Sequence, residues 1–178
     1  MSTIIKKQKL VIDTCFWINI VNLKLHLFLI EYFEIYVTFK VEKEILNENQ
    51  SKIYDTYDME VYKELKKIIK IKEPKENNLK NIENLQKDSG ELYSIFLTIE
   101  EKGIIGTDDN EVIEYCNKNN VKYINSVYFV IFLYKQKKIT LNHTNNYLDL
   151  LTNKIKQKYI DVGKEYLKKE EWNLWKIN

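Results

Sequence analysis

The chain lacks arginine and is poor in proline, glycine, cysteine and histidine. Its 178 residues include one Pro, four Gly, two Cys and two His. Cys15 and Cys116 form no C-x-x-C motif, so neither a zinc site nor a disulfide framework is indicated, and we expect buried thiols. His26 and His143 lie near no obvious nucleophile, which argues against Ser-His or Cys-His hydrolysis. Without arginine, the protein cannot bind phosphate through bidentate guanidinium groups.

Long hydrophobic runs are also missing. No stretch reaches the roughly 18 apolar residues that a membrane span needs. Lys6, Lys7 and Lys9 precede a short apolar run, but the small-residue cleavage pattern of a signal peptide is absent. We therefore expect a cytoplasmic protein with no membrane partner. The length suits one domain over residues 1–178, and a net charge of +2 favours no particular ligand.

Two short apolar stretches each end in acidic residues. Residues 9–12 precede Asp13, and residues 103–107 precede Asp108 and Asp109. Apolar runs of this length predict buried strands. Ligands bind at the carboxyl ends of the strands in open α/β sheets. If the two strands are parallel neighbours, we expect these three acids to converge at one edge.

The rest of the chain alternates between strand and helix patterns, which predicts an α/β fold whose mostly parallel sheet has helices on both faces. Residues 75–87 fit either a peripheral helix or a flap. The predicted strands are 34–38, 69–72 and 121–125 beside the two above. The predicted helices are 14–33, a helix capped by Thr38, 59–69, 88–102 ended by Gly103, one around 112–115, 126–134, 142–159 and 160–178.

Acidic residues stand at four of these predicted boundaries. Carboxylate oxygens suit Mg²⁺ or Mn²⁺, whereas the shortage of His and paired Cys disfavours softer metals. Crowded carboxylates repel one another unless a cation lies between them. One or two such ions can promote hydrolysis of a phosphodiester. The candidates are Asp13, Glu44, Asp88 with Glu91, and Asp108 with Asp109.

Each acid also has a structural alternative. Asp88-x-x-Glu91 and Asp108-x-x-Glu111 match capping boxes, in which the acids only begin a helix. Glu44 fits a solvated helical glutamate, and Asp13 fits the N-cap of the helix that follows it. The spacing alone leaves these alternatives open, and the joint pattern favours the metal site.

Six short segments carry a further pattern, and they are residues 10–14, 41–45, 88–91, 104–109, 125–130 and 137–140. In this order they resemble the PIN domains, metal-dependent ribonucleases common as VapC-like toxins of toxin–antitoxin pairs. The resemblance spans about residues 8 to 140. The chain resembles in particular the PIN variant with a D-x-G-E motif, which is Asp88-Ser89-Gly90-Glu91 here. Asn125-Ser126 departs from the Gly-Thr common in the family, and the insertion over residues 47–87 is long.

This resemblance implies a three-layer α/β/α sandwich with a helical C-terminal extension from about residue 141. It implies an endoribonuclease that uses Mg²⁺ or Mn²⁺, with RNA as substrate and an antitoxin protein or a second copy of the chain as partner. Two hydroxyls, those of Thr14 and Thr107, would support the metal site. The implied catalytic acids are Asp13, Glu44, Glu91 and Asp108, with Asp88 and Asp109 as further metal ligands.

Two other functions fit parts of the sequence. A non-catalytic PIN-like module would bind RNA or a protein, with exposed aromatics such as Tyr54, Tyr57, Trp172 and Trp175 as its surface; the apparently full set of acids argues against it. A phosphotransfer or phosphatase domain would use Asp13 as nucleophile. That function is disfavoured because no second acid lies two residues after Asp13.

Overall fold

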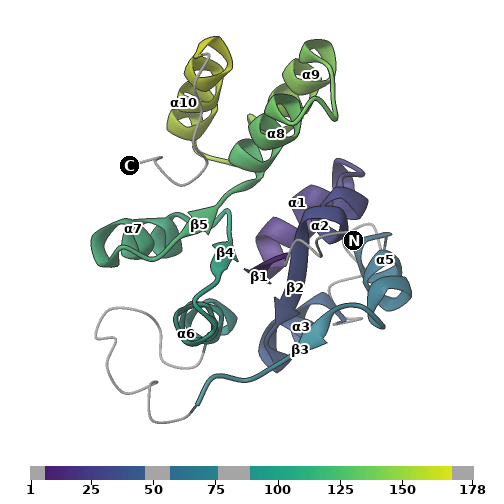
Figure 1. The fold of residues 1–178 in the computed structure, drawn as a ribbon, viewed down its shortest axis with the longest axis vertical. Helices are drawn as coiled ribbons and strands as arrows, with labels where there is room; N and C mark the ends of the chain where they lie inside the picture. The colour runs from purple at the N-terminus through teal and green to yellow at the C-terminus, as the bar shows by residue number, and fades with distance from the viewer. Residues whose placement is uncertain (1–6, 47–56, 76–88, 170–178) are drawn as a thin grey trace, which may run out of the picture.

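The computed structural model describes residues 7–46, 57–75 and 89–169. Within these ranges, five strands form one parallel sheet in the order β3-β2-β1-β4-β5 (Figure 1). The predicted α/β fold is confirmed, as is the short edge strand that now forms β3. The strands are β1 (Gln8–Ile12), β2 (Phe33–Val37), β3 (Lys70–Ile71), β4 (Ile104–Gly106) and β5 (Tyr123–Ile124).

The chain changes direction across the sheet between β1 and β4. β2 and β3 follow on one side of β1, whereas β4 and β5 lie on the other. Ile12 pairs with Gly106, so β1 and β4 end level with each other. This is a topological switch point, where open α/β sheets bind their ligands.

Helices cover both faces of the sheet, so the three-layer sandwich is confirmed. On one face Leu10 and Ile12 share a core with residues of α1 and α8, and on the other Val11 packs with Leu97 of α6. This alternation follows the two-residue period of a strand. The described helices are α1 (Thr14–Asn22), α2 (His26–Tyr32), α3 (Phe39–Ile45), α5 (Tyr57–Leu65), α6 (Gly90–Glu101), α7 (Asn110–Asn119), α8 (Ser126–Lys135), α9 (Leu141–Leu151) and α10 (Gln157–Lys168).

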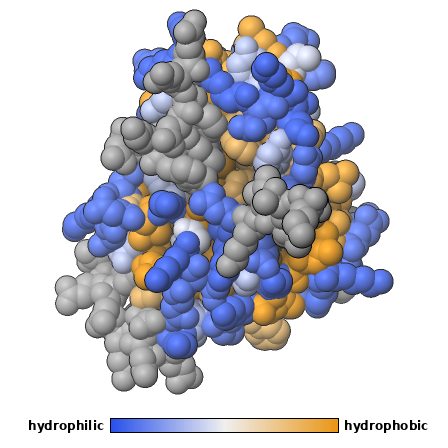
Figure 2. Space-filling view, viewed as in Figure 1, coloured by the Kyte–Doolittle hydropathy of each residue, from blue (hydrophilic) through white to orange (hydrophobic). Residues whose placement is uncertain are grey.

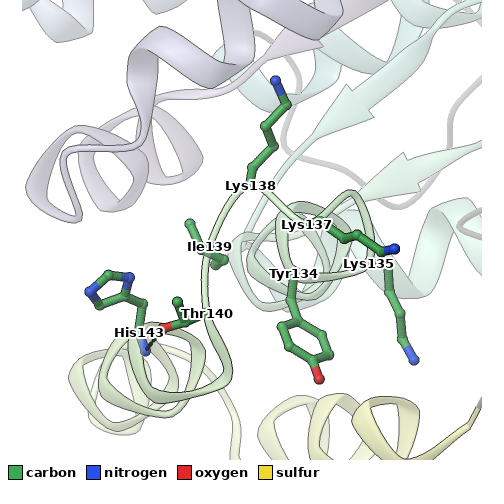
Figure 3. A pocket seen from close by; sticks show the side chains of 7 residues that line it. All are labelled: Tyr134, Lys135, Lys137, Lys138, Ile139, Thr140 and His143. Carbon is green, nitrogen blue, oxygen red and sulfur yellow. Dashed lines mark hydrogen bonds between the residues drawn. The ribbon is translucent and has the colours of Figure 1, made fainter.

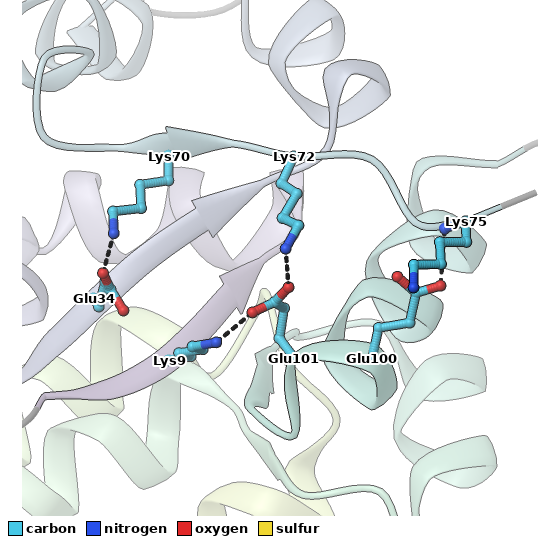
Figure 4. A network of polar contacts seen from close by, with 7 residues as sticks. All are labelled: Lys9, Glu34, Lys70, Lys72, Lys75, Glu100 and Glu101. Carbon is cyan, nitrogen blue, oxygen red and sulfur yellow. Dashed lines mark hydrogen bonds and ion pairs between the residues drawn. The ribbon is translucent and has the colours of Figure 1, made fainter.

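Ion pairs attach the short strand β3 to its neighbours (Figure 4). Lys70 pairs with Glu34 of β2, and Lys72 pairs with Glu101 at the end of α6. Glu101 also pairs with Lys9 of β1. β3 has only two residues, and these ion pairs join the side chains in and beside it to β2 and α6.

Two predicted helices are each divided in the structure. The helix predicted over 14–33 breaks near Lys24, and α1 and α2 meet at a bend of 115°. Lys24 takes the left-handed conformation, with φ of 58°, that usually marks a glycine. The prediction of one helix was therefore wrong, because it relied on the absence of Gly and Pro. The helix predicted over 142–159 is likewise divided, into α9 and the start of α10.

The ends of α6 also differ from the prediction. Ser89 caps its N-terminus by accepting from the N–H of Leu92 at 3.2 Å. At the other end, Lys102 rather than Gly103 takes the left-handed conformation, with φ of 51°. Gly103 is needed for another reason, since an added Cβ would lie 2.9 Å from the carbonyl oxygen of Lys9. Asp88, like Tyr54, Trp172, Trp175 and residues 76–87, lies outside the described residues.

The face of the molecule seen in Figure 2 is largely hydrophilic, and one of its hydrophobic patches lies toward the side of β3, α3 and α5. Exposed apolar side chains there include Phe39, Ile68 and Ile71. Among the described residues, no single helix is long and apolar enough to cross a bilayer, although α1 and α2 together reach that length across their bend.

Candidate functional site

Asp13 lies at the carboxyl end of β1 and caps α1. Its N–H donates to the carbonyl of Gly106 at 3.0 Å, and its Oδ1 accepts from the N–H of Phe16 at 2.8 Å. The residue is only 2% exposed, yet Oδ2 has no hydrogen-bond partner in the part of the chain that the structure describes. Asp13 is therefore the N-cap of α1, as the structural alternative predicted, but only its Oδ1 atom serves as the cap. The other oxygen is a buried acceptor that would gain from a ligand.

Asp108 follows β4 and is held by three donors. Oδ1 accepts from the N–H of Ser126 at 2.8 Å, and Oδ2 accepts from the Ser126 hydroxyl at 2.5 Å. The side-chain amide of Asn19 also donates to Oδ2, at 2.8 Å. These contacts fix the carboxylate beside the end of β1 and leave it little freedom to reorient.

Cys15 connects the two acids. Its thiol donates to Oδ1 of Asp13 at 3.1 Å, and its sulfur accepts from the N–H of Asp108 at 3.4 Å. Burial and the two carboxylates raise the pKa of this thiol well above its ordinary value. The expectation of a buried thiol is met for Cys116, whereas Cys15 is half-buried and forms part of the site.

The environment makes both acids hard to ionise. Burial raises the pKa of Asp13 to about 7, and the charge of the nearby Asp108 carboxylate raises it further. The side chain of Thr107 and the hydrogen bonds from Phe16 and Cys15 lower this pKa and partly offset the rise. Burial also raises the pKa of Asp108, which its hydrogen bonds from Ser126 and Asn19 partly offset. Two buried carboxylates close together are stabilised by a nearby cation.

Glu44 reaches the same region from α3. Its Oε2 accepts from the hydroxyl of Thr14, the residue after Asp13, at 2.5 Å. Gly90 at the start of α6 leaves room for this carboxylate, since an added Cβ would lie 2.6 Å from Oε1 of Glu44. The nearby Glu42 instead pairs with Lys66 at 2.8 Å. Of the two glutamates, Glu44 is therefore the one that lies beside the carboxyl end of β1.

The other predicted ligands are placed differently. Asp109 is the N-cap of α7, and its Oδ1 accepts from the N–H groups of Glu111 and Val112. The predicted capping box placed the N-cap at Asp108, whereas the structure has it one residue later, at Asp109. Thr107 is buried and its hydroxyl accepts from the N–H of Asp109 at 3.1 Å.

The acids in the described part of the chain do not form a compact metal cluster. Among the described residues, no group of three or more His, Cys, Asp or Glu side chains is arranged to hold a metal ion. Asp13 and Asp108 are joined through Cys15, and Glu44 is joined to them through Thr14. Glu91 is half-buried in the first turn of α6, next to Gly90.

A family model described as a PIN domain matches residues 9–167 of this chain. The chain belongs to the PIN domain family. Members of this family are generally nucleases and typically use divalent metals. No curated protein matches the chain. The family match includes α9 and nearly all of α10, the segment that the sequence suggested as an extension.

Three residues of this PIN domain's site were not predicted as such: Cys15, Asn19 and Ser126. Asn19 lies in the second turn of α1 and reaches an acid 89 positions away in the sequence. Ser126 belongs to the Asn125-Ser126 pair that departs from the family pattern, and it begins a predicted helix. Its position directly after a predicted strand was the available signal, since that strand also ends at the switch-point edge.

A separate hollow of about 460 Å³ lies at the far end of α8 from Ser126. Figure 3 shows that the side chains of Lys135, Lys137 and Lys138 spread outward instead of converging on one point. Lys138 pairs with Glu31, and Lys135 donates to the carbonyl of Lys169. This hollow of the PIN domain is therefore a lysine-rimmed surface turn, distinct from the acidic site. Its lining is Tyr134, Lys135, Lys137, Lys138, Ile139, Thr140 and His143.

Proposed function

We propose that this PIN domain is a metal-dependent endoribonuclease that hydrolyses RNA phosphodiester bonds. The observation that carries the proposal is Oδ2 of Asp13, a buried carboxylate oxygen with no partner among the described residues, beside a second buried acid. Family membership supports a nuclease in general, and the arrangement of the acids supports the finer assignment.

The donors fit a hard divalent cation. Asp13 and Asp108 would hold it, with Glu44 and Glu91 orienting its water shell, and Asp88 and Asp109 remain further candidates. Mg²⁺ commonly binds proteins through one or two carboxylates and keeps water or substrate phosphate at its other positions. A site of two acids therefore suffices, and the lack of a three-residue group in the described ranges is compatible with it. Once bound, the cation supplies Lewis-acid stabilisation of the phosphate charge.

The chain's own residues hold the acids in position. The N–H of Phe16 and the thiol of Cys15 fix one oxygen of Asp13, which leaves Oδ2 without a partner among the described residues. Ser126 and Asn19 hold Asp108, and Thr14 holds Glu44. Because these donors are already in place, little reorganisation is needed when substrate binds.

The test is cleavage of mixed RNA with Mg²⁺, with Mn²⁺ and with EDTA. The wild-type protein should cleave only with metal, and Asp13→Asn should not cleave. Asp149→Asn, a change at an exposed acid on α9, serves as the matched control and should retain activity. RNA binding without cleavage by the wild type would overturn this proposal in favour of the non-catalytic module.

The toxin role belongs to the same proposal, together with an antitoxin protein or a second copy of the chain as partner. It predicts that expression of the wild-type chain arrests bacterial growth and that Asp13→Asn removes the effect. Growth arrest that persists with Asp13→Asn would separate any toxicity from the acidic site.

A further inference from the structure

A group of alternating aromatic and basic side chains lies beside the acidic site on α3 and α6. We call it the α3–α6 strip, and it consists of Phe39, Lys40, Lys43 and Tyr93. α3 begins directly after Thr38 at the carboxyl end of β2, so the strip lies at the same edge of the sheet as Asp13 and Asp108.

The strip begins one helical turn from Glu44. Lys40 and Glu44 are four residues apart, so they lie on one face of α3, about 6 Å apart along the axis. On the facing helix, Gly90 and Tyr93 are three residues apart and also lie on one face. Glu44 meets Gly90, and Lys40 meets Tyr93, so the two contacts form successive steps between α3 and α6.

Each aromatic ring of the strip has a lysine amine over its face. Nζ of Lys40 lies 4.1 Å from the centre of the Tyr93 ring, and Nζ of Lys43 lies 4.6 Å from the centre of the Phe39 ring. Phe39 is 49% exposed, unusually open for a phenylalanine. Lys43 is exposed, and no ion pair joins it to another residue in the described ranges.

We propose that the α3–α6 strip binds the single-stranded segment of RNA next to the bond that is cut; this rests on the proposed nuclease function. Exposed aromatic rings stack on unpaired bases of any sequence, and lysines neutralise the phosphates between them. A duplex would satisfy only the lysines, because its bases are already stacked on one another. The strip therefore selects single strands over duplexes without selecting a sequence.

Binding is measured in EDTA, where cleavage cannot occur, by fluorescence anisotropy of a short labelled oligouridine. Phe39→Leu removes the ring and keeps an apolar side chain; it should raise the Kd about 5- to 150-fold, the range for the loss of one stacked base. Lys43→Gln should reduce the slope of log K against log salt by about 0.7, the value for one phosphate contact on a single strand. The same strand paired with oligoadenosine should bind more weakly, and Phe39→Leu should change that binding little.

Two control variants match these changes at exposed positions away from the strip. Leu150→Ala on α9 and Lys137→Gln after α8 should leave both the Kd and the salt slope unchanged. Thermal unfolding of each variant checks that the fold is intact, and Tyr93→Leu provides a second aromatic change if Phe39→Leu lowers stability.

Either of two results with oligouridine would overturn the proposal: a Kd of Phe39→Leu within twofold of wild type, or equal affinity of the wild type for the single strand and the duplex. A third result would do the same: if the wild type binds polyglutamate and the variants lose that binding while they keep their affinity for oligouridine, the strip binds an acidic protein instead. The outcome is separable from the proposed function. Metal-dependent cleavage with unchanged binding by the variants overturns the strip alone. Weakened binding without any wild-type cleavage overturns catalysis and keeps the strip as an RNA site.

Discussion

The N–H of Asp13 donates a hydrogen bond of 3.0 Å to the carbonyl of Gly106, which joins the ends of β1 and β4. Asp108 lies two residues beyond Gly106, so this bond sets the separation of the two buried acids. The strand order places that junction at the switch point of the sheet. The position of the candidate site therefore follows from the topology, and its chemistry follows from the side chains there.

Asp13→Asn should stabilise the protein at neutral pH in metal-free buffer. The pKa of Asp13 is raised from 3.8 to about 7, so its contribution to stability is fully present below about pH 4 and is lost as the pH rises through 7. The full loss corresponds to roughly 4 kcal/mol. Asparagine caps helices as well as aspartate does, so the cap of α1 is kept.

Urea unfolding at pH 4 and pH 8 in EDTA measures this effect. The difference between variant and wild type should be small at pH 4 and should favour the variant at pH 8. Asp149→Asn should show the same stability as wild type at both values. A variant that is less stable than wild type at pH 8 would contradict the buried, partly unpaired state of Asp13.

Ser126→Ala should lower the free energy of unfolding by about 1–3 kcal/mol, because Asp108 loses a short hydrogen bond to a charged group. It should also raise the pKa of Asp108 further and shift the pH profile of cleavage upward, since this hydroxyl lowers that pKa. Ser94→Ala is the matched control, because the buried Ser94 hydroxyl has no partner among the described residues. Equal losses for both variants would remove the special role of Ser126.

Gly90→Ala should reduce activity more than stability. The added Cβ would lie 2.6 Å from Oε1 of Glu44, and a flexible carboxylate can move away from Thr14 at modest cost. A double-mutant cycle with Glu44→Ala separates this contact from other effects. In the Glu44→Ala background, the alanine at position 90 should change the unfolding free energy much less than in wild type. The same change in both backgrounds would mean that Gly90 does not make room for Glu44.

Much of the site could be predicted because each of its acids ends or begins an element. Asp13 and Asp108 each follow a short apolar strand, and parallel strands bring such ends together. Which of Asp108 and Asp109 caps α7 could not be predicted, because adjacent acids fit the same cap. The sequence likewise could not decide between the adjacent residues Asp88 and Ser89 as the cap of α6. The structure has Ser89, which lies one position nearer the helix, as the N-cap.

The contacts that hold the acids were beyond sequence reasoning. Asn19 and Ser126 reach Asp108 from 89 and 18 positions away, so no local pattern reveals them. The bend between α1 and α2 was also missed. There, packing of the core on both sides outweighs the cost of a left-handed lysine, whereas residue preference alone predicts a continuous helix.

Lys102→Gly should raise the free energy of unfolding by roughly 1 kcal/mol, because glycine adopts the left-handed conformation at this helix end without steric cost. Lys164→Gly, at an exposed position inside α10, is the opposite control and should lower it by about 1 kcal/mol. Thermal unfolding distinguishes the two. A lower midpoint for Lys102→Gly would contradict the conformation assigned to Lys102.

Binding of Mn²⁺ tests the central claim most directly, and electron paramagnetic resonance of the free ion measures it without any RNA substrate. Wild-type protein should remove Mn²⁺ from solution in a saturable manner. Asp13→Asn and Asp108→Asn should each weaken that binding at least tenfold, while Asp149→Asn should not. Unchanged Mn²⁺ affinity in Asp13→Asn would show that the free oxygen at the end of β1 holds no metal.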